Sequence, residues 1–252
     1  MEAINWLLVL VRGTALFALF PIFAGPNFPA RLRVVLAALL AFLVAPQLPP
    51  VNLHQMTFGD VVLLLVMETG IGVVLGFAGR MIFFAVEAVG SVVSAETGLN
   101  LAAMLNPFSA TQSQAPGMIL FYLAGMIFLS LDMHHGMLLA FRETYRVLPV
   151  GAAHLHAGLF NDVLAHVSGL FLLMLQMSAP VIAISFVITL IFAVLGRAVP
   201  SMNVFSESFA VRTVAGLIVF GATLSLMAQH IANYVRRLPE DLVRVAQLLG
   251  TG

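Results

Sequence analysis

Seven stretches of this chain are apolar enough to form helices in a membrane, and they leave little sequence for any other element. They cover residues 4–23, 34–46, 61–79, 81–95, 117–131, 169–195 and 213–231. A helix needs about 20 apolar residues to cross the hydrocarbon core of a bilayer, and several of these stretches are shorter. The sequence therefore predicts an all-α integral membrane protein in which some helices are buried in a protein assembly and not in lipid.

The composition supports this class. Only 9% of the residues are charged, whereas soluble domains have about 25%. The formal net charge is zero, with arginine as the only cation besides histidine, and this balance argues against a nucleic-acid partner. Without cysteine the chain can form no disulfide. No polar linker divides it, so we predict one domain over residues 1–252 with an amphipathic C-terminal tail at 233–252.

The number of membrane crossings depends on two neighbouring stretches. Residues 61–79 and 81–95 are separated only around Arg80, so they form either one continuous helix or a tight hairpin. If all seven stretches cross, with the N-terminus outside, eight arginines including Arg80 lie on the cytoplasmic side, and only Arg197 and Arg212 lie opposite. That distribution agrees with the positive-inside rule.

Residues 98–114, the central loop, interrupt the apolar sequence without charge or regular period. Because lipid cannot satisfy free backbone groups, such a segment must be buried in protein or line a cavity. Hydrophobic constrictions close pores by excluding water, and methionine fills irregular gaps. An ordinary surface loop is the alternative, but it should carry charge. The sequence therefore predicts a plug or gate that starts at Gly98 and is centred on Met104, Leu105, Asn106, Pro107 and Phe108.

Three carboxylates, Glu68, Glu87 and Glu96, lie within apolar sequence. An ionisable group inside a membrane is a candidate functional residue by default. These residues either serve a proton-coupled transporter or form buried ion pairs, within the chain or with neighbouring subunits. The carboxylates are isolated and have no relay spacing, which favours ion pairs with Arg12 and Arg80 as natural partners.

Patterns typical of enzymes and metal sites are missing from the sequence. Five histidines crowd residues 134–166, but they lack an ordered acidic ligand or a helical His-x-x-x-His pair. The protease, hydrolase and nucleotide-binding motifs are also missing. We therefore predict no catalytic activity, no metal and no cofactor. The charged tail could lie on anionic lipid, cap the last helix or contact a cytosolic partner, and the sequence leaves these open.

Residues 196–205, Gly-Arg-Ala-Val-Pro-Ser-Met-Asn-Val-Phe, resemble the signature of the FliR/SctT family. This family comprises export-gate subunits of flagellar and virulence type III secretion systems. Blocks at residues 21–46, 87–107 and 134–151 match the family in the same order, so the resemblance extends from about residue 5 to residue 235. The chain departs from the family after the signature, where residues 206–212 replace a proline-containing pattern. The signature positions are Arg197, Pro200, Met202, Asn203, Val204 and Phe205.

The resemblance implies a non-enzymatic subunit of the bacterial inner membrane. Its helical hairpins would assemble with FliP-like and FliQ-like subunits into a hetero-oligomeric helical channel that contacts an FlhB-like protein and passes unfolded protein substrates. The central loop would help to close this channel. A flagellar system is the first expectation and a virulence homologue the alternative. A rival from another class is a stand-alone proton-coupled transporter that uses Glu68, Glu87 and Glu96.

Overall fold

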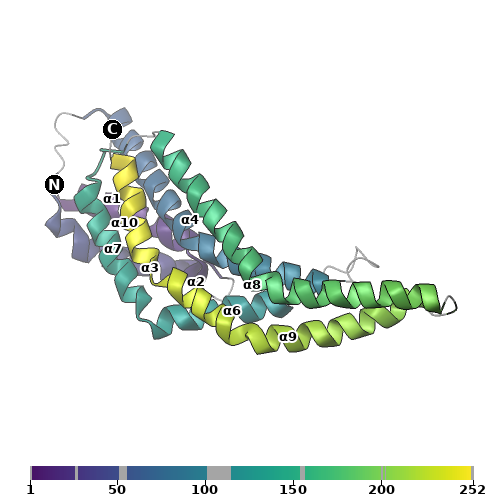
Figure 1. The fold of residues 1–252 in the computed structure, drawn as a ribbon. Coiled ribbons are helices and arrows are strands. Elements are labelled where there is room, and N and C mark those ends of the chain that lie inside the picture. The colour runs from purple at the N-terminus through teal and green to yellow at the C-terminus, as the bar shows by residue number, and fades with distance from the viewer. Residues whose placement is uncertain are drawn as a thin grey trace. The chain divides into compact units, whose positions relative to one another are not determined.

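A computed structural model describes residues 2–25, 28–50, 56–100, 115–153, 157–199, 201 and 203–250. Every regular element in these ranges is a helix (Figure 1), which confirms the all-α prediction. Four helices in the described part of the chain are long and apolar enough to cross a membrane, and a fifth span is possible if α6 and α7 count as one broken span.

The N-terminal part contains four short elements. These are α1 (Glu2–Leu19), α2 (Pro21–Ala24), α3 (Ala30–Val44) and the 3-10 turn η1 (Ala45–Gln47). Pro21 occupies the first position of α2, where its missing N–H has no helical partner to lose. The connection to α3 is held by Arg33, whose Nη2 donates to the carbonyls of Ala24, Gly25 and Phe28 at 3.1–3.3 Å.

The next helix, α4, runs without a break from Phe58–Glu96 over 39 residues. It starts at a capping arrangement in which Asp60 Oδ2 accepts hydrogen bonds from the N–H and the hydroxyl of Thr57, at 2.8 and 2.6 Å. Residues 61–79 and 81–95 thus belong to one helix. The seven-crossing arrangement, which needs a loop at Arg80, is wrong. Gly79 instead serves packing, because a Cβ there would stand 2.8 Å from the ring of Phe20.

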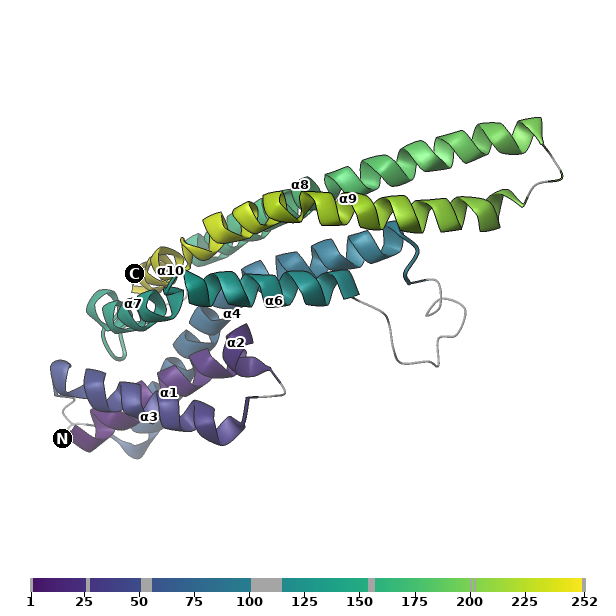
Figure 2. The same cartoon turned by 90° about the horizontal axis from the view of Figure 1, so that it is seen from below.

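Five helices follow: α6 (Ala115–Ser130), α7 (Met133–Val147), α8 (Ala157–Ala198), α9 (Val204–Val235) and α10 (Leu238–Gly250). The second part of α8 and α9 run antiparallel and side by side, as Figures 1 and 2 both show. Hydrogen bonds join their described residues. Arg212 Nη2 donates to Thr189 Oγ1 at 3.1 Å, and the hydroxyl of Tyr234 donates to the carbonyl of Gly169 at 3.5 Å.

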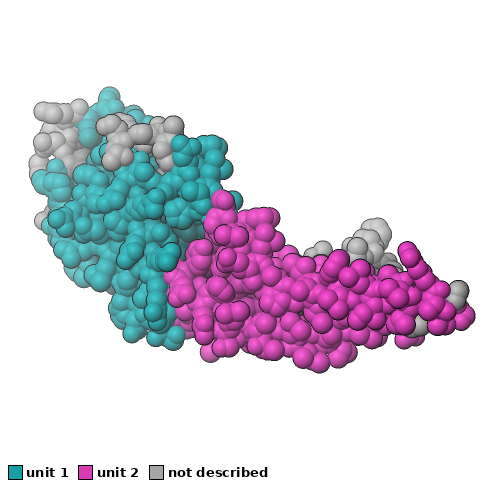
Figure 3. All heavy atoms as spheres, in the orientation of Figure 1, with its two compact units in different colours: residues 1–81, 129–167, 236–252 teal, residues 82–128, 168–235 magenta. Residues whose placement is uncertain are grey.

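The chain divides into two compact units (Figure 3). Unit 1 comprises residues 1–81, 129–167 and 236–252, and unit 2 comprises residues 82–128 and 168–235. Helices α4 and α8 each contribute to both units, so the division does not follow any linker in the sequence. The prediction of a single domain over residues 1–252 stays a prediction.

The C-terminal tail is a packed helix of unit 1. The buried face of α10 lies against α7. Pro239 of α10 covers Gly136 of α7 so closely that a Cβ at position 136 would lie 3.0 Å from the proline ring. The residues of this face are Leu238, Leu242, Val245, Ala246 and Leu249. An amphipathic helix binds lipid through its apolar face. Because α7 covers that face, the tail cannot insert into lipid through it, and contact of its charged residues with anionic lipid stays a prediction.

Candidate functional site

The structure describes both ends of the central loop but not its centre. Met104, Leu105, Asn106, Pro107 and Phe108 lie outside the described residues, so the plug itself stays a prediction. Gly98 follows the last turn of α4, and residue 115 begins α6. Both ends belong to unit 2, and their packing decides how the loop is held.

The C-terminal end of α4 is fixed by hydroxyl groups from two other helices. The last carbonyls of a helix have no partner within it, and leaving them unpaired in apolar surroundings costs free energy. Ser185 of α8 donates its Oγ to the Glu96 carbonyl at 3.3 Å. Thr213 of α9 donates its Oγ1 to the Thr97 carbonyl at 2.6 Å. Neither donor could be predicted from the sequence, because no local pattern connects residues this far apart.

Gly98 is required by its backbone conformation and by its neighbour. Its φ of +73° lies in the left-handed region, which glycine adopts without the steric cost that a Cβ brings. This conformation is common at the residue that ends a helix. The ring of Phe209 on α9 also occupies the place that a Cβ at Gly98 would need. The loop therefore leaves α4 in a direction set by Gly98 and Phe209.

The other end of the loop is fixed by close contact between α4 and α6. A Cβ at Gly90 would collide with the backbone of Gly117, so the two helices touch backbone to backbone. The rings of Phe83 and Phe121 add an aromatic contact along the same pair, with centroids 5.5 Å apart. Pro116 lies at the second position of α6, where it removes no helical hydrogen bond.

We expect Gly90→Ala to destabilise unit 2 by about 1–3 kcal/mol, because the added methyl group must displace the backbone of α6. Gly125→Ala on α6 is the matched control, since nothing lies within 4 Å of a Cβ built there. That change should be neutral or stabilise the helix by up to about 1 kcal/mol. Thermal unfolding of the detergent-purified proteins measures both, and equal melting temperatures for the two variants would contradict the close contact.

The family signature forms the turn between α8 and α9. Asn203 caps α9: its Oδ1 accepts the N–H of Ser206 at 3.3 Å, and its carbonyl accepts the N–H of Glu207 at 3.1 Å. Val204 lies close to Gly196, where a Cβ would meet it at 2.6 Å. Arg197 is exposed in the last turn of α8, where its charge suits the helix dipole.

The rest of the signature cannot be placed. Pro200 and Met202 lie outside the described residues, and so does the side chain of Phe205. The described part of the block therefore has a local role in joining two long helices closely, and a role in assembly stays a prediction.

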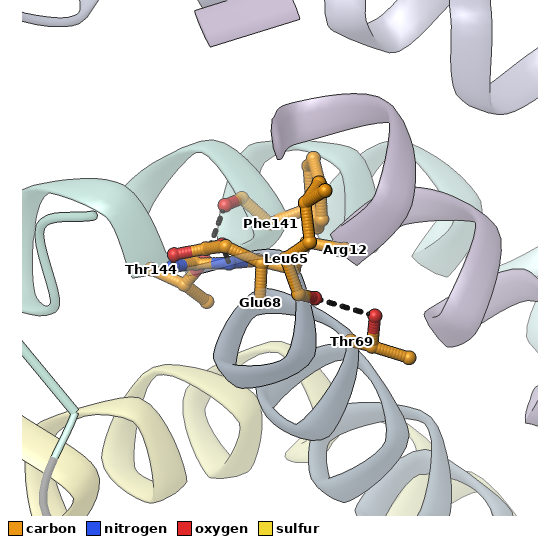
Figure 4. Close-up of polar contacts among 6 residues, drawn as sticks. All are labelled: Arg12, Leu65, Glu68, Thr69, Phe141 and Thr144. Atoms are coloured by element: carbon orange, nitrogen blue, oxygen red, sulfur yellow. Dashed lines mark hydrogen bonds and ion pairs between the residues drawn. The ribbon is translucent and has the colours of Figure 1, made fainter. Parts of the chain in front are cut away.

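In unit 1, Arg12 and Glu68 form an ion pair with no exposed side-chain surface (Figure 4). Arg12 on α1 donates Nε and Nη2 to the two carboxylate oxygens of Glu68 on α4, at 2.6 and 2.9 Å. Its Nη1 donates to Thr144 Oγ1 of α7 at 3.3 Å. The guanidinium also lies 3.8 Å from the centroid of the Tyr145 ring. We call these four residues the Arg12 cluster; it joins three helices.

The Arg12 cluster lies where two glycines of α4 allow α1 to approach closely. A Cβ at Gly72 would collide with the Arg12 carbonyl, and one at Gly76 would stand 2.9 Å from the Leu16 carbonyl. The two glycines thus let the short Glu68 side chain reach the guanidinium in bidentate geometry, the strongest form of this contact. Since both carboxylate oxygens of Glu68 are occupied by Arg12, this glutamate is not a free proton carrier.

The other candidate carboxylates belong to unit 2. Glu87 and Glu96 are both half-buried on the second half of α4. Arg80 is half-buried within the same helix in unit 1. Its pairing with a glutamate of the apolar segments stays a prediction. For Glu68 the structure shows the ion pair directly, with Arg12 as its partner.

One group of possible metal ligands meets where α7 begins. Ligand atoms of Asp132, His134 and His135 lie within 4.8 Å of one another. Asp132 has a left-handed φ of 55° and lies beside the two histidines, although no sequence pattern connects it with them. The positive end of the helix dipole disfavours a cation here. That the protein holds no metal stays a prediction.

Comparison with known proteins identifies relatives over nearly the whole chain. The family model described as bacterial export proteins, family 1, matches residues 3–238. The flagellar biosynthetic protein FliR of Escherichia coli K12 is 26% identical over 95% of this chain and 93% of its own length. The protein of the same name from Bacillus subtilis is 27% identical over 97% and 95%. That from Pectobacterium carotovorum is 28% identical over 96% and 95%.

Proposed function

The chain belongs to the bacterial export proteins, family 1, and from this membership we propose that it is a non-enzymatic subunit of the flagellar type III protein export gate. The FliR/SctT resemblance of residues 196–205 is confirmed by this membership. The protein lies in the bacterial inner membrane, in agreement with its membrane-spanning helices. The flagellar name of the three relatives favours the flagellar branch over the virulence branch.

The length of the apolar helices carries the proposal that the subunit works inside an assembly. Residues 163–196 of α8 contain no aspartate, glutamate or arginine. At about 1.5 Å per residue this segment is roughly 51 Å long, whereas the hydrocarbon core of a bilayer is about 30 Å thick. The excess cannot face water, because large apolar patches are rare on free protein surfaces. We infer that other polypeptides cover it. The exposed side chains of the segment include Phe171, Leu172, Phe186, Ile191 and Val194.

The partners we propose are FliP-like and FliQ-like subunits in the channel and an FlhB-like protein in contact with it. The channel passes unfolded proteins, and the central loop closes it at rest. Two features support the loop's role. Its residues carry no charge, and both of its ends are fixed in unit 2, at Gly98 and at Gly117. An uncharged segment held at both ends can close a pore and still yield to a passing chain.

Affinity purification tests the assembly. A tag on this chain, expressed with the FliP-like and FliQ-like proteins of the same bacterium, should recover all three in one complex. Deleting the gene should abolish flagellar filaments and swimming, and re-expression should restore both. A stable homo-oligomer that is active without these partners would instead favour the transporter that the sequence left as a rival.

A further inference from the structure

A small notch on the surface of unit 2 is lined by Glu87. It has a volume of about 170 Å³ and lies between α4 and α6. Glu87 precedes Gly90 by one helical turn, so it lies on the face where the two helices touch. Gly117, Met118, Phe121 and Tyr122 of α6 line the notch. Met118 and Tyr122 are 56% and 58% exposed, so the notch opens onto an apolar surface.

The parts of α4 and α6 that belong to unit 2 bring no positive charge to the notch, and Arg80, the cation of α4, belongs to unit 1. Residues 82–96 of α4 contain two glutamates and no arginine, and α6 contains no charged residue. The central loop, which connects the two helices, is uncharged as well. Within the described part of the chain, no cation lies in ion-pair contact with the Glu87 carboxylate.

We propose that the notch receives a lysine or arginine side chain from a neighbouring subunit of the assembly. This inference rests on the proposed function, since it requires a neighbour. An ionised carboxylate in apolar surroundings is costly unless it is paired, and intramembrane charges usually pair with one another. We therefore expect the partner to present an apolar helix that carries one lysine or arginine. The methylene groups of that side chain would lie along Met118 and Tyr122, and its charged group would contact Glu87.

Charge reversal at Glu87 tests the pairing in the complex purified through a tag on this chain. Glu87→Lys should lower the yield of co-purified FliP-like and FliQ-like subunits by roughly ten-fold or more, because two cations would then meet without compensation. Glu87→Gln should cause a smaller loss. Glu207→Lys, at an exposed position of α9 in the same unit, is the control and should stay within about two-fold of the wild type.

Photo-crosslinking gives a second measurement that leaves Glu87 intact. The chain carries p-benzoylphenylalanine at position 122 in place of tyrosine, and the adduct is mapped by mass spectrometry. We expect a crosslink to a partner helix with a lysine or arginine within one turn of the linked residue. An acidic substitution of that cation should restore the yield of Glu87→Lys.

The outcomes separate this inference from the proposed function. If the wild-type chain is recovered without any partner subunit, the proposed function fails. If the wild-type complex forms and Glu87→Lys is recovered at the same yield, only the notch inference fails. An adduct with lipid alone, or with a helix that has no nearby cation, also overturns it. Gel filtration of the isolated Glu87→Lys chain shows whether a low yield reflects misfolding. If it does, the crosslink from position 122, which leaves Glu87 intact, decides whether a partner cation lies at the notch.

Discussion

Arg12→Met should lower the free energy of unfolding by about 3–5 kcal/mol, because it leaves the Glu68 carboxylate buried without a cation. Since native proteins are stable by only about 5–15 kcal/mol, this loss removes a large share of the total. The melting temperature should fall by roughly 6–20 °C for a chain of this size. Circular dichroism of the detergent-purified variant during heating measures the change.

The double variant Arg12→Met, Glu68→Leu separates the cost of an unpaired charge from the value of the pair. A buried ion pair replaced by apolar residues of similar volume is often neutral or stabilising. We therefore expect the double variant to be more stable than Arg12→Met, although it carries one more substitution. The exposed pair of Arg146 and Glu143, at 3.2 Å, is the control. Arg146→Met should cost less than about 1 kcal/mol.

The single variants Arg12→Met and Glu68→Leu complete the comparison. If their losses of unfolding free energy simply added in the double variant, the role of the Arg12 cluster would be contradicted. Residues in direct contact normally show an interaction energy of about 0.5–3 kcal/mol in such a cycle. A value near zero would mean that Arg12 and Glu68 do not depend on each other in the folded protein.

Deleting residues 106–110 should make the assembled channel leak ions while protein export persists at least in part. A dry apolar constriction excludes ions at rest. We expect its loss to raise the resting conductance roughly ten-fold or more, which corresponds to a barrier lowered by about 1.4 kcal/mol. Conductance of the purified complex in planar bilayers measures the leak, and secretion of a flagellar substrate measures export.

Two substitutions of the loop control for its length. Phe108→Ser keeps the chain length but introduces a hydroxyl, so it should raise the resting conductance less than the deletion does. Ser109→Ala removes a polar group and should leave the channel closed. An unchanged conductance in a deletion variant that assembles normally would contradict the plug.

Much of the function could be predicted from local sequence. The signature at residues 196–205 identified the family, and the apolar stretches predicted the helical membrane class. The boundary at Arg80 could not be predicted, because a glycine followed by an arginine is compatible with both a hairpin and a continuous helix. Packing of Phe20 against Gly79 accompanies the continuous helix, and this contact joins residues from two separate stretches.

The partners of buried polar groups were also beyond local sequence. Arg12 was a natural partner for a buried carboxylate. Glu68, Glu87 and Glu96 all lie in apolar sequence, so the sequence did not distinguish which of them Arg12 contacts. Tertiary contact selects Glu68 and adds Thr144. In the same way, Ser185 and Thr213 reach the end of α4 through packing alone.

Composition and periodicity by themselves determined that this chain is helical, that it lies in a membrane and that an uncharged loop interrupts it. These properties depend on how each segment interacts with lipid or water, which its own residues decide. Only the tertiary structure decided which charges meet, where helices touch backbone to backbone and how the loop's ends are fixed. Those features depend on distances between segments far apart in sequence. The contacts that form them contribute to stability only once the helices have packed against one another.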